Sequence, residues 1–208
     1  MNYSTRFWNR IAKFYSKKPV GDEQSYQKKL AETRKRLSRE MNVLEFGCGT
    51  GSTALVHAPY VHHYQAIDVS PKMIEIAKNK LSATDIKNLD FKVAALEAYS
   101  VASESLDAVL GLSILHLLNN REDVIHQIYT LLKPGGMFIS STPCLGDSMA
   151  YFRFISPIGS FLGLMPKVEV FTQQELKNSL EQAGFHIEYT FVPESSKEVC
   201  FLIVLKPK

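Results

Sequence analysis

Between residues 42 and 141, short β-type runs alternate with helical runs. The β-type runs cover 42–46, 64–68, 89–94, 106–111 and 137–141. The helical runs cover 51–57, 71–81 and 121–132, and Lys-Pro-Gly-Gly at 133–136 is expected to end the last of them. Ser70 has the N-cap position and Pro71 the first helical position of the second helix. Because strands that alternate with helices form βαβ units, the pattern predicts an α/β fold with a doubly wound parallel sheet.

Two segments lie outside this alternation. Residues 3–18 and 24–39 have helical patterns, separated by Pro19-Val20-Gly21. Residues 142–170 hold three prolines, three glycines and many aromatic residues without a periodic pattern. Doubly wound sheets bind ligands at the carboxyl ends of their strands. We expect residues 1–40 and 142–170 to cover that edge of the sheet, and residues 1–20 and 142–168 to be the most mobile parts of the ligand-free chain.

The C-terminal part returns to regular structure. Thr172 and Glu175 have capping-box spacing, and Gly184 follows the end of the helix that they begin. Two β-type runs follow and are expected to pair antiparallel. The length of 208 residues suits one domain. We predict a single domain, residues 1–208, in four parts: a helical N-terminal cover (1–40), a core (41–141), a lid insert (142–170), and a helix with a strand pair (171–208).

The first β-type run ends in a turn that is rich in glycine. Gly47, Gly49 and Gly51 fall at alternate positions, and Glu45 precedes them. Glycine has no Cβ, so a ligand can touch the backbone of such a turn. A second acid, Asp68, ends the next β-type run, where a carboxylate can accept hydrogen bonds from ribose hydroxyls.

The same turn lacks both common phosphate-binding patterns. The dinucleotide pattern G-x-G-x-x-G requires a glycine where this chain has Ser52. No Gly-Lys-Ser/Thr follows, so the turn is not a P-loop for a triphosphate. The turn therefore favours a ligand that contains a nucleoside but no phosphate.

Five segments in order resemble the class I S-adenosylmethionine-dependent methyltransferases, in their small-molecule branch. These are VLEFGCGTG (43–51), AIDVSPKMIEIAKNK (66–80), LDAVLGLSILHLL (106–118), LLKPGGMFISS (131–141) and FTQQELKNSLEQAGF (171–185). The resemblance implies a Rossmann-like, seven-stranded sheet of order 3-2-1-4-5-7-6 with strand 7 antiparallel. It also implies S-adenosyl-L-methionine as the cofactor and S-adenosyl-L-homocysteine as its product.

The resemblance also assigns cofactor contacts to residues of this chain. Glu45 would hold the cationic end of the cofactor, the turn its methionine part, Asp68 its ribose, and Val69 with Met73 its adenine. The full expected set is Glu45, Gly47, Cys48, Gly49, Thr50, Gly51, Asp68, Val69, Met73, Ala95, Leu96, Gly111 and Leu112. Ala95 stands where the family often has an acid that meets the adenine amino group. Either the Leu96 backbone N–H or the Glu97 carboxylate would then contact the adenine in its place.

The sequence says less about the binding site of the methyl acceptor than about that of the cofactor. After the fourth β-type run the chain has GLSILH instead of the Asn/Asp-Pro-Pro-Tyr type of motif that is typical of enzymes methylating bases or glutamine. His116 is a candidate general base, and a structural histidine is the alternative. The aromatic covers favour a small apolar, aromatic or lipid-like acceptor. The candidate acceptor-binding residues are Tyr15, Tyr151, Arg153 and Phe154.

Charge leaves two other functions open. Residues 1–40 hold eleven Lys or Arg against four Asp or Glu, a net charge of +7, while the remainder carries −4. This basic segment is a solvated face or a surface for an anionic partner, so an RNA or protein methyltransferase stays an alternative, as does a transient contact with a membrane surface. A non-catalytic module that binds adenosylmethionine is the third hypothesis. There is no strong nucleic-acid signal, and the oligomeric state is not predicted.

Composition bears on where the protein works. No apolar run reaches the roughly 18 residues of a membrane span, and the N-terminus has no apolar signal core. Cys48, Cys144 and Cys200 show neither metal-ligand spacing nor a disulfide framework, which fits a reducing compartment. We therefore expect a cytoplasmic protein without a metal site.

Overall fold

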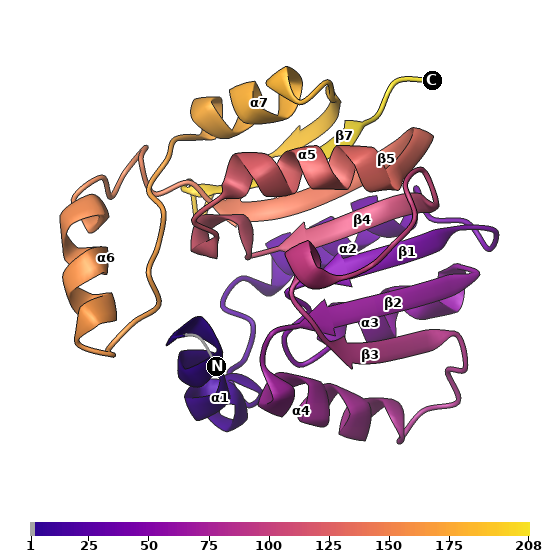
Figure 1. Ribbon diagram of the computed structural model, residues 1–208, viewed down its shortest axis with the longest axis horizontal. Helices are drawn as coiled ribbons and strands as arrows, with labels where there is room; N and C mark the ends of the chain where they lie inside the picture. Colours follow the sequence, from indigo (N-terminus) through magenta and orange to yellow (C-terminus); the bar gives the residue numbers. More distant parts are fainter. Residues whose placement is uncertain (1–2) are drawn as a thin grey trace. The chain divides into compact units, whose positions relative to one another are not determined.

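The computed structural model describes residues 3–208; Met1 and Asn2, which belong to the predicted N-terminal cover, lie outside the described residues. Seven strands form one sheet of order β3-β2-β1-β4-β5-β7-β6. β7 pairs antiparallel with both β5 and β6 (Figure 1). The predicted fold class and strand order are confirmed. By its internal contacts the chain divides into two compact units, Met1–Ser100 with Leu106–Leu110, and Val101–Ser105 with Gly111–Lys208.

The first unit holds the strands that carry the glycine turn. Its elements are α1 (Tyr3–Tyr15), α2 (Glu23–Arg34), β1 (Asn42–Phe46), α3 (Ser52–His57), β2 (His63–Asp68), α4 (Pro71–Leu81), β3 (Leu89–Val93), short 3-10 helices at Ala58–Tyr60 and Leu96–Ala98, and most of β4 (Leu106–Leu112). β1 pairs parallel with β2, with Phe46 opposite Ile67, and β2 pairs parallel with β3. This register brings the end of β1 and Asp68, the last residue of β2, to the same edge of the sheet.

α4 shows why this part of the sequence folds locally. The Ser70 side chain accepts a hydrogen bond from the Met73 backbone N–H at 3.1 Å, so Ser70 is the N-cap as predicted. Met73, Ile74 and Ala77 are buried at helical spacing, so one face of α4 packs into the core. Burial of the Met73 and Ile74 side chains stabilises the fold by about 1.5–3 kcal/mol each.

The second unit contains the C-terminal elements. They are a 3-10 helix at Leu115–Leu117, α5 (Arg121–Leu131), β5 (Leu132–Pro143), α6 (Phe152–Phe161), α7 (Gln173–Gln182), β6 (His186–Phe191) and β7 (Val199–Leu205). Phe201–Val204 in β7 are fully buried, as is typical of an interior strand. The predicted capping box of α7 is present, because Thr172 Oγ1 accepts from Glu175 N–H and the Glu175 carboxylate accepts from Thr172 N–H.

Several predicted boundaries differ from the structure, among them the end of α1, which lies at Tyr15 instead of residue 18. α2 ends at Arg34 instead of residue 39, because the chain turns over residues 35–40 before it enters β1. The segment 133–136 is part of β5: Gly135 N–H donates to Lys206 O and Lys206 N–H donates to Gly136 O, so contacts with the end of the chain extend the strand. Thr142 and Pro143 also pair with β7, so the insert begins at Cys144.

The insert contains a helix that the sequence pattern did not predict. α6 includes Pro157, which lacks the N–H that a helix interior normally uses. None of the described helices is long and apolar enough to cross a membrane.

Candidate active site

The glycine turn after β1 has the backbone geometry that its sequence predicts. Gly47, Gly49 and Gly51 all have positive φ, at 64°, 54° and 75°. A Cβ on Gly51 would lie 2.5 Å from the Phe91 ring, so this glycine also permits close internal packing. A Cβ on Gly49 would meet only the Tyr15 ring, at 3.8 Å. The positive φ of Gly49 is therefore the observed reason for a glycine at this position.

Asp68 joins the end of β2 to this turn. One carboxylate oxygen accepts from Gly49 N–H at 2.9 Å, and the other accepts from Ser70 N–H at 2.8 Å. Burial raises the pKa of Asp68, and the two backbone hydrogen bonds oppose that rise. The carboxylate is thus fixed beside Gly49, with lone pairs left for further donors such as ribose hydroxyls.

Glu45 is a buried acid that no cation of residues 3–208 neutralises. It is 3% exposed, and its carboxylate accepts a hydrogen bond from Tyr64 O–H at 2.9 Å. Burial raises its pKa to about 8, although the Tyr64 hydrogen bond lowers it. No described residue supplies a positive charge to this carboxyl group. Such an acid fits a cationic ligand, and the amino group and sulfonium of adenosylmethionine are cations.

Two residues beside the turn were missed from the sequence. Tyr64, in β2, holds the Glu45 carboxylate. Lys80, in α4, donates to Thr50 Oγ1 and to Ser52 Oγ, both at 3.0 Å, and so ties the turn to α4. Tyr64 lies within the β-type run at 64–68 and Lys80 ends the AIDVSPKMIEIAKNK segment, but no spacing rule joins them to the turn.

The N-terminal helix lies on this turn. Tyr15, the last residue of α1, is 45% exposed, and partial burial followed by the charge of Asp68 raises its pKa. Asn9 Oδ1 accepts from Ser70 Oγ at 2.7 Å and from Lys72 N–H at 3.1 Å, so α1 is anchored at the start of α4. Within the first unit, the predicted cover is therefore attached to the same loops that carry Asp68.

The remaining expected cofactor residues differ in how open they are. Cys48 is buried and its pKa is raised well above the ordinary value, mainly by burial, so it is a neutral thiol. Met73 and Leu96 are 2% and 3% exposed, while Val69 and Ala95 are half-buried and Glu97 is exposed. In this structure Met73 belongs to the core of the first unit.

In the second unit, Gly111 is buried and Leu112 ends β4 half-buried. His116 follows in the 3-10 helix, and its carbonyl accepts from Glu169 N–H at 2.7 Å. Its Nδ1 is buried without a hydrogen-bond partner among the described residues, and burial lowers its pKa to about 4. The imidazole is therefore neutral at pH 7, and a pKa of about 4 makes it a weak base.

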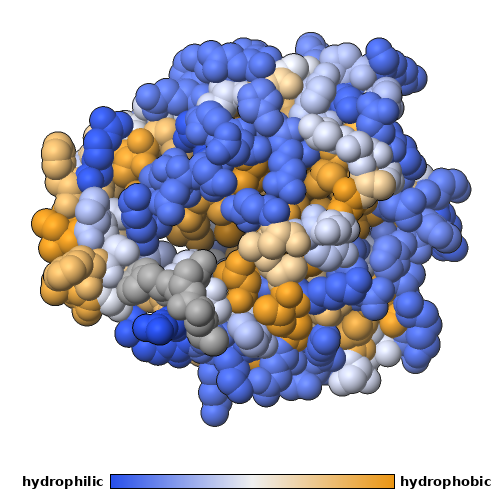
Figure 2. All heavy atoms as spheres, viewed as in Figure 1, coloured by the Kyte–Doolittle hydropathy of each residue, from blue (hydrophilic) through white to orange (hydrophobic). Residues whose placement is uncertain are grey.

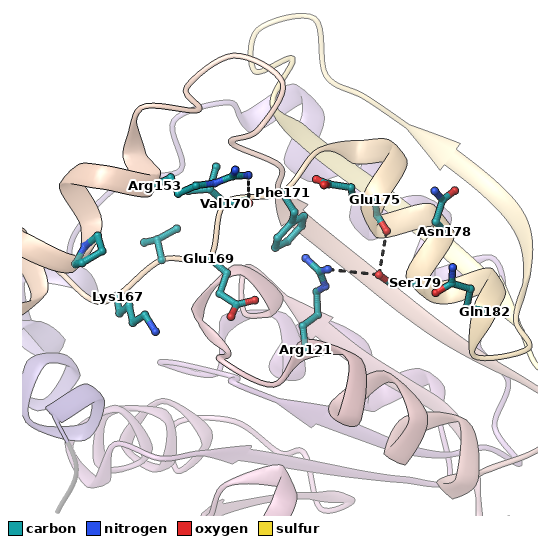
Figure 3. Close-up of a pocket in the computed structure, with 12 residues that line it drawn as sticks. Arg121, Arg153, Lys167, Glu169, Val170, Phe171, Glu175, Asn178, Ser179 and Gln182 are labelled. Atoms are coloured by element: carbon teal, nitrogen blue, oxygen red, sulfur yellow. Dashed lines mark hydrogen bonds between the residues drawn. The ribbon is translucent and has the colours of Figure 1, made fainter.

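A cavity of about 590 Å³ opens in the second unit (Figure 3). Arg121, the first residue of α5, is 8% exposed, and its guanidinium lies 4.0 Å from the Phe171 ring centroid. The same guanidinium donates to the Glu122 carboxylate and to Ser179 Oγ, while its Nε has no partner among the described residues. Arg121 was not predicted from the sequence, although a cation in the first turn of a helix opposes the helix dipole and is a usable signal.

The predicted acceptor residues of the insert lie in and beside this cavity. Arg153 lines it and donates to Val170 O at 3.4 Å. Tyr151 and Phe154 do not line it; they are 55% and 76% exposed. Other charged lining residues are Lys167, Glu169 and Glu175.

Known proteins match this chain over most of its length. A family model described as a methyltransferase domain matches residues 43–136. A malonyl-[acyl-carrier protein] O-methyltransferase of Ilyobacter polytropus is 31% identical over 174 residues, covering 81% of this chain and 63% of its own length. A demethylmenaquinone methyltransferase of Leptospira interrogans is 32% identical over 114 residues, covering 52% of this chain and 45% of its own length.

The solved structure of YcgJ from Bacillus subtilis shares the fold, with a TM-score of 0.70 at 14% identity and coverage of 88% of this chain and 99% of YcgJ. Across eight curated relatives the chain spans between 7% and 63% of the relative's own length.

Proposed function

Because this chain belongs to the class I S-adenosylmethionine-dependent methyltransferases, we propose that it transfers a methyl group from S-adenosylmethionine to a small, apolar or aromatic, lipid-like acceptor. The observation that carries the proposal is the pair of acids at the ends of β1 and β2. Glu45 is buried with no cation at its carboxyl group among residues 3–208, and Asp68 is fixed beside the glycine turn. The family and the fold imply S-adenosylmethionine as the cofactor, and its amino group and ribose match these two acids.

The roles of the protein residues follow from their surroundings. Glu45 provides the negative charge that holds a cationic group, and Tyr64 keeps that carboxylate in place. Asp68 accepts hydrogen bonds from ribose while it holds Gly49 N–H. The bound cofactor supplies an activated methyl group on a sulfonium. The contribution of the protein is then approach and alignment, which need no strong base.

His116 is proposed as an acceptor of a hydrogen bond from the methyl acceptor. With a pKa of about 4 the imidazole is neutral at pH 7, so the ring can accept such a bond without prior deprotonation. This role suits an acceptor that is already nucleophilic. We also propose that the insert, from Cys144 to residue 170, contacts the acceptor through Tyr151, Arg153 and Phe154.

Two features favour an apolar body in the acceptor. The insert exposes large apolar side chains, Phe154 at 76% among them. The demethylmenaquinone methyltransferase that resembles this chain is named for a quinone acceptor. The cytoplasm stays the expected location.

The proposal is tested by incubating the purified chain with methyl-labelled S-adenosylmethionine and fractionated metabolite extracts, with products identified by mass. A labelled small molecule that forms with the native chain and not with an Asp68→Ala variant supports the proposal. Label in RNA or protein instead would favour the basic N-terminal segment as the acceptor surface. Cofactor binding with no labelled product in any fraction would favour a non-catalytic module.

Asp68→Ala is expected to weaken binding of S-adenosylmethionine by about 1.5–3 kcal/mol for each charge-assisted hydrogen bond lost. The variant also frees Gly49 N–H, so the turn loses a fixed point. Isothermal titration calorimetry measures the change, and Asp85→Ala, at an exposed loop position, is the matched control. Unchanged affinity in Asp68→Ala would remove this residue from the site.

Cofactor binding is expected to slow hydrogen exchange in residues 3–20 and 142–168. α1 is held to α4 by Asn9 but leaves Phe14 75% exposed, and the insert is interrupted by prolines and glycines. Segments of this kind open at low free energy, and lids are drawn from them. Exchange with and without S-adenosylhomocysteine is the measurement, and deletion of residues 1–20 should reduce turnover more than stability. Equal, strong protection of both segments in both states would identify them as permanent core.

A further inference from the structure

Lys80 holds the two residues on either side of Gly51, the last glycine of the turn after β1. Its ammonium group donates to Thr50 Oγ1 and to Ser52 Oγ, each at 3.0 Å. A lysine ammonium has three protons to donate, so one side chain can bond both hydroxyl oxygens at once. Lys80 lies in the last turn of α4, whereas Ser52 is the first residue of α3. We call this pair of hydrogen bonds the Lys80 clamp.

The surroundings of Lys80 differ from those of the other lysines of α4. The outward face of this helix is polar, with Lys72 and Lys78 exposed, and hydrophilic atoms line the lower edge of Figure 2, where Figure 1 places α4. Lys80 is half-buried, and burial lowers its pKa. No acid among residues 3–208 forms an ion pair with it. Loss of hydration by an ammonium costs free energy, and the two hydroxyl oxygens are the described groups that offset it.

The helix that carries Lys80 does not depend on the clamp. The N-cap bond of Ser70 fixes the first turn of α4, and Met73 and Ile74 fix its buried face. Lys78 supplies a second cation to the last turn, where the helix dipole favours one. Removal of the Lys80 ammonium therefore leaves the main supports of α4 in place, and its effect falls on the glycine turn.

The glycine turn has few other fixed points. Its glycines have more backbone freedom to lose on ordering than other residues have. Asp68 accepts from Gly49 N–H at 2.9 Å and fixes the start of the turn, and Gly51 N–H donates to Cys48 O at 3.0 Å within it. Gly51 is also the N-cap of α3, where it has no side chain that could make the cap hydrogen bond. The Lys80 clamp fixes the chain on both sides of this residue.

Lys80 reaches the turn from the side that is packed. A Cβ on Gly51 would lie 2.9 Å from Ala77 Cβ, so protein fills this side of the turn. Lys80 follows Ala77 by three residues and lies on the same face of α4. At Gly49, among the described residues, a Cβ would meet the Tyr15 ring alone, at 3.8 Å. The clamp therefore supports the turn from behind and leaves the side at Gly49 open to a ligand.

We propose that Lys80 is a positioning residue for cofactor binding, whose ammonium orders the glycine turn through Thr50 and Ser52 before the cofactor arrives. This inference rests on the proposed function, because it concerns the affinity for S-adenosylmethionine. A turn that is ordered in advance loses less conformational freedom on binding, so its affinity is higher. Loss of the clamp weakens cofactor binding even though Lys80 lies outside the contacts predicted for the cofactor.

The test is calorimetric titration of the whole chain with S-adenosylmethionine. Lys80→Met keeps the length of the side chain and removes both hydrogen bonds, and it is expected to weaken binding by at least about tenfold. Lys80→Arg keeps donors for both hydroxyls and is expected to bind within about threefold of the native chain. Lys78→Met, at an exposed position in the same helical turn, is the matched control and should bind as the native chain does.

A double-mutant cycle separates the clamp from a general effect on stability. Thr50→Val with Ser52→Ala removes the two acceptors and is expected to weaken binding as much as Lys80→Met does. Addition of Lys80→Met to that pair should weaken binding by no more than about twofold further, because the clamp is already lost. Fully additive losses, or no recovery of affinity in Lys80→Arg, would overturn the inference.

Hydrogen exchange of the ligand-free chain measures the ordering of the turn directly. In Lys80→Met the amides of Gly49 and Gly51 are expected to exchange at least about tenfold faster, while the amides of α4 keep their native rates. Faster exchange throughout α4 would mean that Lys80 stabilises the fold in general, and the inference would be wrong. Failure of the native chain to bind the cofactor would overturn the proposed function and this inference together. Native binding that Lys80→Met leaves unchanged would overturn this inference alone.

Discussion

Gly49→Val is expected to abolish binding of S-adenosylmethionine, a loss of at least about a hundredfold in affinity. Gly49 has φ +54°, a conformation that a β-branched residue adopts only at a cost of about 1–3 kcal/mol. Rotation to a negative φ would relieve the strain but would move the Gly49 N–H away from Asp68. Either the valine side chain occupies the space of the ligand, or the turn that holds Asp68 changes shape.

The fold of this variant should survive. Among the described residues, a Cβ at position 49 would meet the Tyr15 ring alone, at 3.8 Å, an ordinary contact. The melting temperature is therefore expected to fall by no more than about 10 °C. Gly21→Val is the matched control, because no atom lies within 4 Å of its added Cβ and its φ is not in the left-handed region. Normal binding by a folded Gly49→Val chain would contradict the site, and an unfolded variant would assign this glycine a structural role.

Sequence patterns correctly predicted the helices and strands whose bounds are set by residues close together in the sequence. β1 at 42–46 and α4 at 71–81 have the predicted bounds, because alternation, an N-cap and a proline at the first helical position are all local signals. The glycine turn was also predicted from the sequence, and Gly47, Gly49 and Gly51 all have the positive φ that favours glycine. The roles of Glu45 and Asp68 stay predictions, which the variants above test.

The structural features that were not predicted from the sequence depend on contacts between residues far apart in the chain. The N-terminal extension of β5 requires Lys206, which lies some seventy residues further along the chain and bonds with Gly135 and Gly136. α6 forms despite Pro157, with its small side held by contacts from Ser156 to Val168. No periodicity rule reports such pairings, so they emerge only with the tertiary structure.

The same limit applies inside the candidate site. The bond between Tyr64 and Glu45 joins residues on neighbouring strands, and its existence follows from the parallel register of β1 and β2. The resemblance implied the strand order, but neither the register of β1 against β2 nor the direction of each side chain. Tyr64 therefore looked like an ordinary strand residue, although it is the one described side chain that bonds the buried acid.

Glu45→Gln is expected to make the ligand-free chain more stable at pH 7 and to weaken cofactor binding. The folded chain keeps the Glu45 proton up to about pH 8, whereas the ordinary pKa of the group is 4.5. Between these values the unfolded chain binds fewer protons than the folded chain, so the free energy of unfolding falls as pH rises. The loss amounts to about 3 kcal/mol at pH 7, taking about 1.4 kcal/mol per pH unit as an upper limit. Glutamine carries no proton to lose, and it can still accept the Tyr64 hydrogen bond.

The measurements are thermal melting and calorimetric titration of S-adenosylmethionine between pH 5 and pH 8, a range set by the two pKa values of Glu45. The stability gap between Glu45→Gln and the native chain should be near zero at the low end and should widen toward the high end. The affinity of the native chain should rise with pH, because the cation binds the ionised carboxylate, and the affinity of Glu45→Gln should stay flat and at least about tenfold lower near pH 8. Glu181→Gln, at an exposed position in α7, is the matched control and should change neither profile. Parallel stability profiles for the native chain and Glu45→Gln would mean that Glu45 is ionised in the folded chain, and the buried acid would then not be the group that awaits a cation.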